Sequence, residues 1–186
     1  SQSLLKVQPK KGLGREGYQL IITPDGAQLR YSQETGAFRG LASFAQILKQ
    51  ATRRNPSIPC LTITDEPDFD QRGIMLDISR CKVPTLATLK SLIDQLAQLK
   101  FNQLQLYTEH TFAFSAHSKV WQQASPMTAA DIVEIQRYCA DRFIDLVPNL
   151  NSFGHFERWL RHPNYQHLAE CPNGFIHPLT GKKSRW

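Results

Sequence analysis

Polar and charged side chains follow three short apolar runs of this 186-residue sequence, each close to the carboxyl end of its run. They are, in chain order, Asp77 and Arg80, then Glu109 and His110, then Asn149 and Asn151. The carboxyl ends of parallel strands are where α/β folds place their chemistry. A carboxylate beside an imidazole, as at Glu109 and His110, could orient another group or accept a hydrogen bond from a hydroxyl.

Arg72 stands at the start of the first run. A charged residue that begins a buried strand needs a reason, and the five fixed donors of a guanidinium suit neighbouring hydroxyl groups. The alternative is a structural ion pair with a carboxylate such as Asp77. The residue types alone leave both interpretations open.

The three apolar runs are residues 71–80 (QRGIMLDISR), 101–107 (FNQLQLY) and 144–148 (IDLVP). Short apolar runs between turn formers are typical of strands buried on both faces, as in parallel sheets. A leucine-rich amphipathic helix is expected between the first two runs, and a capping box at residues 128–131 opens another before the third. The order predicts a βαβαβ unit and an α/β fold.

The first third of the sequence predicts a small α+β layer. Its elements are a hairpin over residues 18–23 and 27–31, an amphipathic helix over 34–52 and a strand over 58–64. The hairpin rests on the turn signal Pro24-Asp25-Gly26. Residues 1–16 show no periodicity and are expected to form a loop or the remnant of an earlier strand. Residues 65–70 (DEPDFD) are expected to be the hinge to the βαβαβ unit.

Composition excludes several functional classes. No apolar run reaches the roughly 18–20 residues that span a bilayer, so we expect no membrane partner. The net charge is +6, and a basic face before Pro59 could touch nucleic acid, but without interleaved aromatic residues a solvated surface is expected instead. Neither metal-ligand spacing nor a glycine-rich phosphate loop is present, so we expect no metal and no cofactor. Four cysteines without a CxxC pattern are expected to be free thiols: Cys60, Cys81, Cys139 and Cys171.

Several longer motifs resemble the β-N-acetylhexosaminidases of glycoside hydrolase family 20. They are GAFRGLASFAQIL at 36–48, IPCLTITDEPDFDQRGIMLDISR at 58–80, LAQLKFNQLQLY at 96–107 and LVPNLNSFGH at 146–155. In the last motif Phe153 replaces the proline of the family's Pro-Gly-His turn. The resemblance covers roughly residues 17–175, and YTEHTFAF, SPMT and NSFGHFERWL look most like a bacterial subgroup.

The resemblance implies a fold and an activity. Residues 1–66 would form the family's non-catalytic α+β domain, and residues 67–186 the amino-terminal part of its (β/α)8 TIM-type catalytic barrel. Members are retaining hydrolases that remove terminal N-acetylhexosamine, so the implied partner is a glycan that contains this sugar. The acetamido oxygen of the substrate attacks the anomeric carbon, a carboxylate orients the acetamide, and a glutamic acid protonates the leaving oxygen.

The family's adjacent Asp-Glu pair follows the fourth barrel strand, and no such pair occurs here in that context. Asp65-Glu66 lies before the barrel and belongs to the hinge. A closed barrel needs eight strands and about 250 residues, whereas this sequence has room for three strands. We therefore expect an amino-terminal piece of the enzyme that contains no catalytic residue and is inactive alone.

The resemblance also implies roles for single residues. Arg72 matches the family arginine that holds sugar hydroxyls, Glu109 and His110 lie where members carry an acidic residue, and His155 would support the catalytic carboxylates through a hydrogen bond. Asn151 could donate to sugar or cap the next turn, and His155 could instead cap a helix. The expected substrate-binding residues are therefore Arg72, Glu109, His110, Asn151 and His155. Asp77 and Arg80 are expected to pair and brace the barrel floor.

Two other classes of function stay open. A shortened relative that keeps Arg72 and His155 could be a non-catalytic carbohydrate-binding module, although three strands apolar on both faces would leave an aggregation-prone edge. A basic domain that binds nucleic acid would show steeply salt-dependent binding. The sequence assigns neither linkage specificity nor an oligomeric state. It begins with neither an initiator methionine nor a charged-then-apolar leader, and it assigns no compartment.

Overall fold

The computed structural model describes residues 5–54, 57–80 and 82–184. Its contacts divide the chain into two compact units that alternate along the sequence. The first comprises Ser1–Gly73, Lys90–Gln103 and Tyr138–Asp145, and the second Ile74–Leu89, Leu104–Arg137 and Leu146–Trp186. The units therefore do not follow the single boundary expected after residue 66, and that domain boundary stays a prediction.

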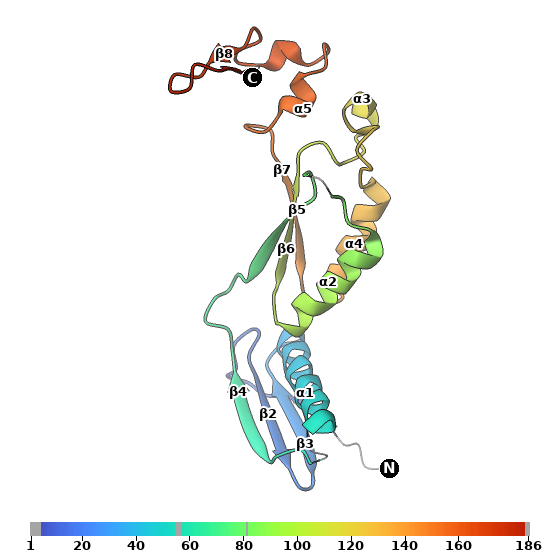
Figure 1. Cartoon of the computed structure of the whole chain (residues 1–186). Helices are drawn as coiled ribbons and strands as arrows, with labels where there is room; N and C mark the ends of the chain where they lie inside the picture. The colour runs from blue at the N-terminus through green and yellow to red at the C-terminus, as the bar shows by residue number, and fades with distance from the viewer. Residues whose placement is uncertain (1–4, 55–56, 81, 185–186) are drawn as a thin grey trace. The chain divides into compact units, whose positions relative to one another are not determined.

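The first unit contains a four-stranded sheet with the order β1-β3-β2-β4. The strands are β1 (Leu5–Pro9), β2 (Tyr18–Thr23), β3 (Gly26–Tyr31) and β4 (Leu61–Asp65), and helix α1 (Glu34–Arg54) lies against one face (Figure 1). The hairpin is confirmed, since β2 and β3 pair antiparallel from Thr23↔Gly26 onward. Part of the segment 1–16, expected without periodicity, is the strand β1, which pairs parallel with β3.

Alternate residues of this sheet form its core. Tyr18, Leu20, Ile22, Ala27 and Leu29 are buried, and Phe44 and Ile47 of α1 pack against them. This period of two is what a sheet with one covered face requires. Helix and sheet approach closely at Gly40, where a Cβ atom would lie 2.3 Å from the Leu29 Cδ1 atom.

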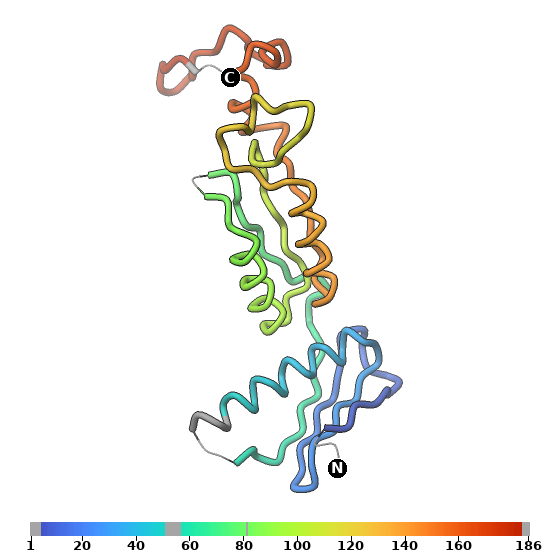
Figure 2. The backbone as a smooth tube through the Cα atoms, turned by 90° about the vertical axis from the view of Figure 1, so that its right-hand side faces the viewer, coloured from blue at the N-terminus to red at the C-terminus, as the bar shows by residue number. Residues whose placement is uncertain are grey.

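The βαβαβ unit is confirmed. Strands β5 (Gly73–Asp77), β6 (Gln103–Thr108) and β7 (Asp145–Leu150) form a sheet in that order, joined through α2 (Leu86–Gln98) and α4 (Ala129–Ala140). Figures 1 and 2 show α2 and α4 side by side on one face of this sheet. Connections through helices are those of parallel strands. The α/β class is therefore correct, and closure into a barrel stays a proposal.

The sequence predicted that all three strands of this sheet are buried on both faces, and the structure differs from that prediction. Leu104 and Leu106 of the central strand are buried, but Met75 of β5 is 58% exposed and Leu150 of β7 is also exposed. The helices cover only one face, so the prediction is wrong for the two outer strands. An apolar residue type does not reveal whether another element covers it.

The capping box is confirmed at the start of α4. The Asp131 N–H donates to Thr128 Oγ1 at 3.1 Å, and the Thr128 N–H donates to Asp131 Oδ2 at 2.8 Å. The pKa of Asp131 is lowered, first by that backbone N–H and then by the Thr128 hydroxyl. Two of the free amides at the helix start are thereby satisfied.

Short elements follow these strands in the second unit. They are η1 (Ser115–His117), α3 (Ser118–Trp121), α5 (Glu157–Leu160), η2 (Gln166–Leu168), β8 (Phe175–Ile176) and β9 (Lys183–Ser184). Within the described ranges no helix is long and apolar enough to cross a membrane. Cys60, Cys139 and Cys171 are free thiols, and Cys81 lies outside the described residues.

Candidate functional site

A connected polar cluster lies in the second unit, where β5, β6 and β7 end. Backbone hydrogen bonds hold these ends together: the Ile78 N–H donates to the Tyr107 carbonyl at 3.1 Å, and the Asn151 N–H to the Thr108 carbonyl at 2.9 Å. Each strand therefore delivers its last side chains, and those of the residues just beyond, to the same edge of the sheet.

Arg80 lies at the centre of this cluster. Its guanidinium pairs with Asp77 and with Glu109 Oε1, the latter at 2.9 Å, and lies 5.2 Å from the centre of the Tyr107 ring. Its Nη2 atom is also 3.3 Å from Nδ1 of His155. The side chain is still 49% exposed, so it can present N–H groups to a ligand.

Asp77 orients the turn that carries Arg80. Its Oδ1 atom accepts the N–H of Ser79 at 2.8 Å and that of Arg80 at 3.2 Å. Burial acts to raise the pKa of Asp77, but these backbone donors and the Arg80 guanidinium outweigh it, so the pKa is lowered. The pKa of Arg80 is raised, first by its hydrogen bond to Asp77. Both groups are therefore held in their charged forms.

Glu109 is buried, and its carboxylate accepts two donors. The Tyr107 hydroxyl donates to Oε1 at 3.0 Å, and Arg80 pairs with the same oxygen. The Tyr107 hydroxyl in turn accepts from the Asn151 amide at 2.8 Å, and Asn151 Oδ1 accepts the Gly154 N–H at 3.1 Å. Asn151 thus caps the next turn, as one of its two predicted roles required.

His110 and His155 differ in environment. His155 is exposed, has the unusual backbone angle φ = 52°, and contacts Arg80. His110 is 6% exposed, and within the described residues its Nδ1 atom has no hydrogen-bond partner. Burial lowers the pKa of His110, and Arg158 and Arg161 lower it further, so the neutral imidazole is favoured.

Arg72 belongs to the first unit, whereas the other four predicted site residues belong to the second. Its guanidinium donates to the Lys100 carbonyl at 3.0 Å, the Phe69 carbonyl at 2.7 Å and Glu16 Oε2 at 2.6 Å. This is the predicted structural ion pair, with Glu16 in place of Asp77. The geometry gives the sugar-binding prediction for Arg72 no support.

Arg80, at the centre of this cluster, was not among the substrate-binding residues expected from the sequence. It was expected to pair with Asp77, and it does. It was also expected to brace the barrel floor, and that stays a prediction; Arg80 follows the carboxyl end of β5. It lies just beyond a strand end, as Glu109 and Asn151 do.

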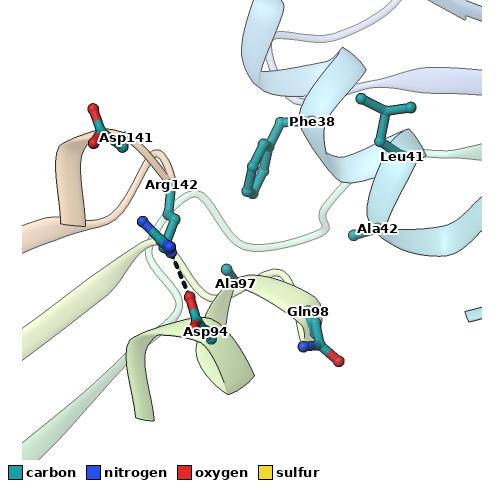
Figure 3. Close-up of a pocket in the computed structure, with 8 residues that line it drawn as sticks. All are labelled: Phe38, Leu41, Ala42, Asp94, Ala97, Gln98, Asp141 and Arg142. Atoms are coloured by element: carbon teal, nitrogen blue, oxygen red, sulfur yellow. Dashed lines mark hydrogen bonds and ion pairs between the residues drawn. The ribbon is translucent and has the colours of Figure 1, made fainter. Parts of the chain in front are cut away.

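Two hollows in the described ranges bear on the site. One, of about 510 Å³, adjoins the cluster and is lined by residues that include His155, Phe153, Glu157 and Glu170. The other, of about 440 Å³ in the first unit, lies between α1, α2 and the end of α4, and Figure 3 shows its Asp94–Arg142 ion pair. The second hollow contains no predicted site residue. Nowhere in the described parts of the chain do three or more His, Cys, Asp or Glu residues gather as a metal site would require.

The strands of this α/β sheet place charged and hydroxyl-bearing side chains at its carboxyl edge. Such an arrangement is typical of α/β proteins that bind a ligand or catalyse a reaction. Two family descriptions match this sequence: "Glycosyl hydrolase family 20, domain 2" over residues 2–66 and "Glycosyl hydrolase family 20, catalytic domain" over residues 69–175. The chain belongs to glycosyl hydrolase family 20, a family of enzymes.

Curated relatives agree with this assignment. A beta-hexosaminidase of Akkermansia muciniphila is 32% identical over 170 residues, which cover 82% of this chain and 34% of the relative. The human beta-hexosaminidase subunit beta is 31% identical over 153 residues, which cover 77% of this chain and 27% of the relative. The chain thus spans between about a quarter and a third of the length of these proteins.

Solved structures show the same fold. A beta-N-acetylhexosaminidase crystal structure has a TM-score of 0.79 at 31% identity and covers 88% of this chain and 38% of that protein. A mutant Streptomyces plicatus beta-hexosaminidase in complex with product (GlcNAc) has a TM-score of 0.78 at 26% identity, with coverages of 98% and 40%.

Proposed function

We propose that this chain is part of a β-N-acetylhexosaminidase that removes terminal N-acetylhexosamine from glycans by substrate-assisted retaining catalysis. The observation that carries the proposal is the connected cluster Arg80–Glu109–Tyr107–Asn151 at the strand ends of a family 20 chain. The cluster holds one exposed cation beside buried acceptors and hydroxyls, a set that suits a sugar with several neighbouring hydroxyl groups.

In this proposal Arg80 contacts the terminal sugar. Asp77 and Glu109 pair with its guanidinium from the two neighbouring strand ends, which fixes its plane before a ligand arrives. A preorganised guanidinium can donate two parallel hydrogen bonds to adjacent hydroxyls at little further loss of side-chain entropy. His155, next to Arg80 and on the rim of the 510 Å³ hollow, would lie beside the same sugar.

The bond-breaking step needs no nucleophile from these residues. In substrate-assisted catalysis the acetamido oxygen of the sugar attacks the anomeric carbon, and a protein acid protonates the leaving oxygen. We propose that the adjacent Asp-Glu pair that performs these tasks in the family lies outside residues 1–186, in a barrel that these three strands begin. The chain alone would then bind sugar at most and would not hydrolyse it.

The test compares the full-length gene product with the isolated 186-residue chain on a chromogenic N-acetyl-β-glucosaminide. The full-length protein should hydrolyse it with retained anomeric configuration, measured by NMR of the first product formed. Substitution of the acetamide by a trifluoroacetamide should slow hydrolysis strongly, since fluorine removes electron density from the attacking oxygen. Full hydrolysis of a matched β-glucoside without the acetamide would refute the mechanism. Activity in the isolated chain would refute the placement of the Asp-Glu pair.

The carbohydrate-binding module is distinguished by the same experiment. A full-length protein that binds N-acetylglucosamine in calorimetry but leaves the chromogenic substrate intact would favour the module. Salt-dependent retention on nucleic acid without sugar binding would favour a basic domain that binds nucleic acid.

A further inference from the structure

The main chain of Glu109 is held from both sides, by the side chain of Ser79 just after β5 and by that of Trp159 in α5. Its N–H donates to Oγ of Ser79 at 2.6 Å, and its carbonyl accepts from the indole Nε1 of Trp159 at 2.6 Å. Ser79 and Trp159 are both buried. Glu109 is the first residue after β6, at the start of a connecting segment, where backbone freedom is ordinarily greater than in a strand.

The two side chains that hold Glu109 are themselves fixed. The Ser79 hydroxyl lies 3.1 Å from the Thr111 hydroxyl. The backbone N–H of Ser79 donates to Asp77 Oδ1. The Trp159 ring stacks on Phe156 with centroids 5.0 Å apart and 10° between planes. Edge contacts with His117 at 5.2 Å and Tyr165 at 5.6 Å and a tilted contact with Phe114 at 6.0 Å also surround it.

We propose that Ser79 and Trp159 are positioning residues that set the place of the Glu109 carboxylate, and through it the orientation of Arg80 toward the sugar. This inference rests on the proposed function. The carboxylate has its contacts to Arg80 and Tyr107 only if the backbone at Glu109 stays where these two hydrogen bonds hold it. A displacement of about 1 Å in a positioning group is enough to disturb the interactions that it aligns.

The substitution Trp159→Phe removes the indole N–H and keeps an aromatic ring in the stack. Trp121→Phe is a matched control, because the Trp121 indole also donates to a backbone carbonyl in the same unit, that of Phe114 at 2.8 Å, without touching Glu109. Ser79→Ala removes the support on the N–H side and tests the proposal independently if Trp159→Phe folds poorly.

The first measurement follows the Arg80 Nε–H signal by NMR in the full-length protein, which needs no activity. Trp159→Phe and Ser79→Ala should each shift this signal and speed its exchange with water, whereas Trp121→Phe should leave it unchanged. An unchanged Arg80 signal in both variants overturns the proposal.

The second measurement is sugar affinity. Trp159→Phe and Ser79→Ala should raise KM and the inhibition constant of N-acetylglucosamine about fivefold, the size of one lost hydrogen bond, with Trp121→Phe within twofold of wild type. A merely structural role would instead lower the amount of active enzyme, so kcat would fall with both constants unchanged, and that result overturns the proposal. If the Arg80 signal responds while the wild-type protein neither binds nor cleaves the sugar, the proposed function fails and the positioning role stands.

Discussion

Arg72 and Arg80 flank the same strand, and we expect their substitution to affect different properties, stability in one case and sugar binding in the other. Arg80 follows the carboxyl end of β5, is half exposed and pairs with Glu109. Arg72 immediately precedes β5 and donates from all three guanidinium nitrogens to protein acceptors. We predict that Arg80→Ala removes sugar binding with the fold retained, and that Arg72→Ala destabilises the fold.

The magnitudes follow from these contacts. Loss of two charge-assisted hydrogen bonds from Arg80 to a sugar should weaken binding about 100-fold. Arg72→Ala removes a largely buried partner of Glu16 and leaves two carbonyl acceptors unmatched, which should cost about 2–4 kcal/mol of unfolding free energy. Because the Arg72 guanidinium donates to Glu16, Phe69 and Lys100 rather than to residues of the cluster, the affinity of the remaining folded protein should change less than twofold.

The assay measures two quantities on each variant of the full-length protein: the inhibition constant of N-acetylglucosamine and the urea midpoint. Arg137→Ala is the control, since Arg137 is an exposed arginine on α4 in the same unit as Arg80. The reasoning is refuted if Arg72→Ala weakens sugar binding 100-fold at an unchanged urea midpoint. It is also refuted if Arg80→Ala binds like the control.

Three further predictions concern the stability and reactivity of the described residues. Burial acts to raise the pKa of Glu16, but its two arginine partners outweigh burial and lower it, so the stability from Glu16 is complete above its usual pKa and is lost as the pH falls through the lowered value. Glu16→Gln should therefore flatten the acid side of the urea-midpoint profile, whereas exposed Asp68→Asn should not. Asp131→Ala should lower the unfolding free energy by about 1 kcal/mol in urea titrations through loss of the capping box, and an unchanged value would show that the cap contributes nothing. Burial raises the pKa of the Cys139 thiol to about 11, so at pH 8 a thiol reagent followed by mass spectrometry should label exposed Cys171 at least tenfold faster; equal rates would contradict this burial.

Local sequence signals predicted the elements well because each rests on contacts between near neighbours. The hairpin follows from a turn signal, and the start of α4 follows from a capping box only four residues long. The βαβαβ order follows from apolar periodicity. The sequence left residues 1–16 open between a loop and a strand remnant, because the alternation of β1 covers only Leu5 to Gln8 and its partner strand β3 lies some twenty positions away.

Distant partners could not be predicted in the same way. The partner of Arg72 is Glu16, from a segment without periodicity, and the same carboxylate also pairs with buried Arg39 of α1. Nothing in the spacing of these residues selects Glu16 over Asp77. Trp159 is buried, and its hydrogen bond to the Glu109 carbonyl depends on a contact across 50 positions.

The direction of the sheet decides between the two arginines where residue type does not. At the amino ends of the strands the Arg72 N–H donates to Asn102 Oδ1 and the Asp145 N–H to the Asn102 carbonyl, so backbone and side chains satisfy one another there. At the carboxyl ends the strands stop and the charged groups Asp77, Arg80 and Glu109 meet with the guanidinium half exposed. A ligand gains most where preorganised donors still reach solvent, so a sugar-binding arginine in this chain should be sought after β5 and not before it.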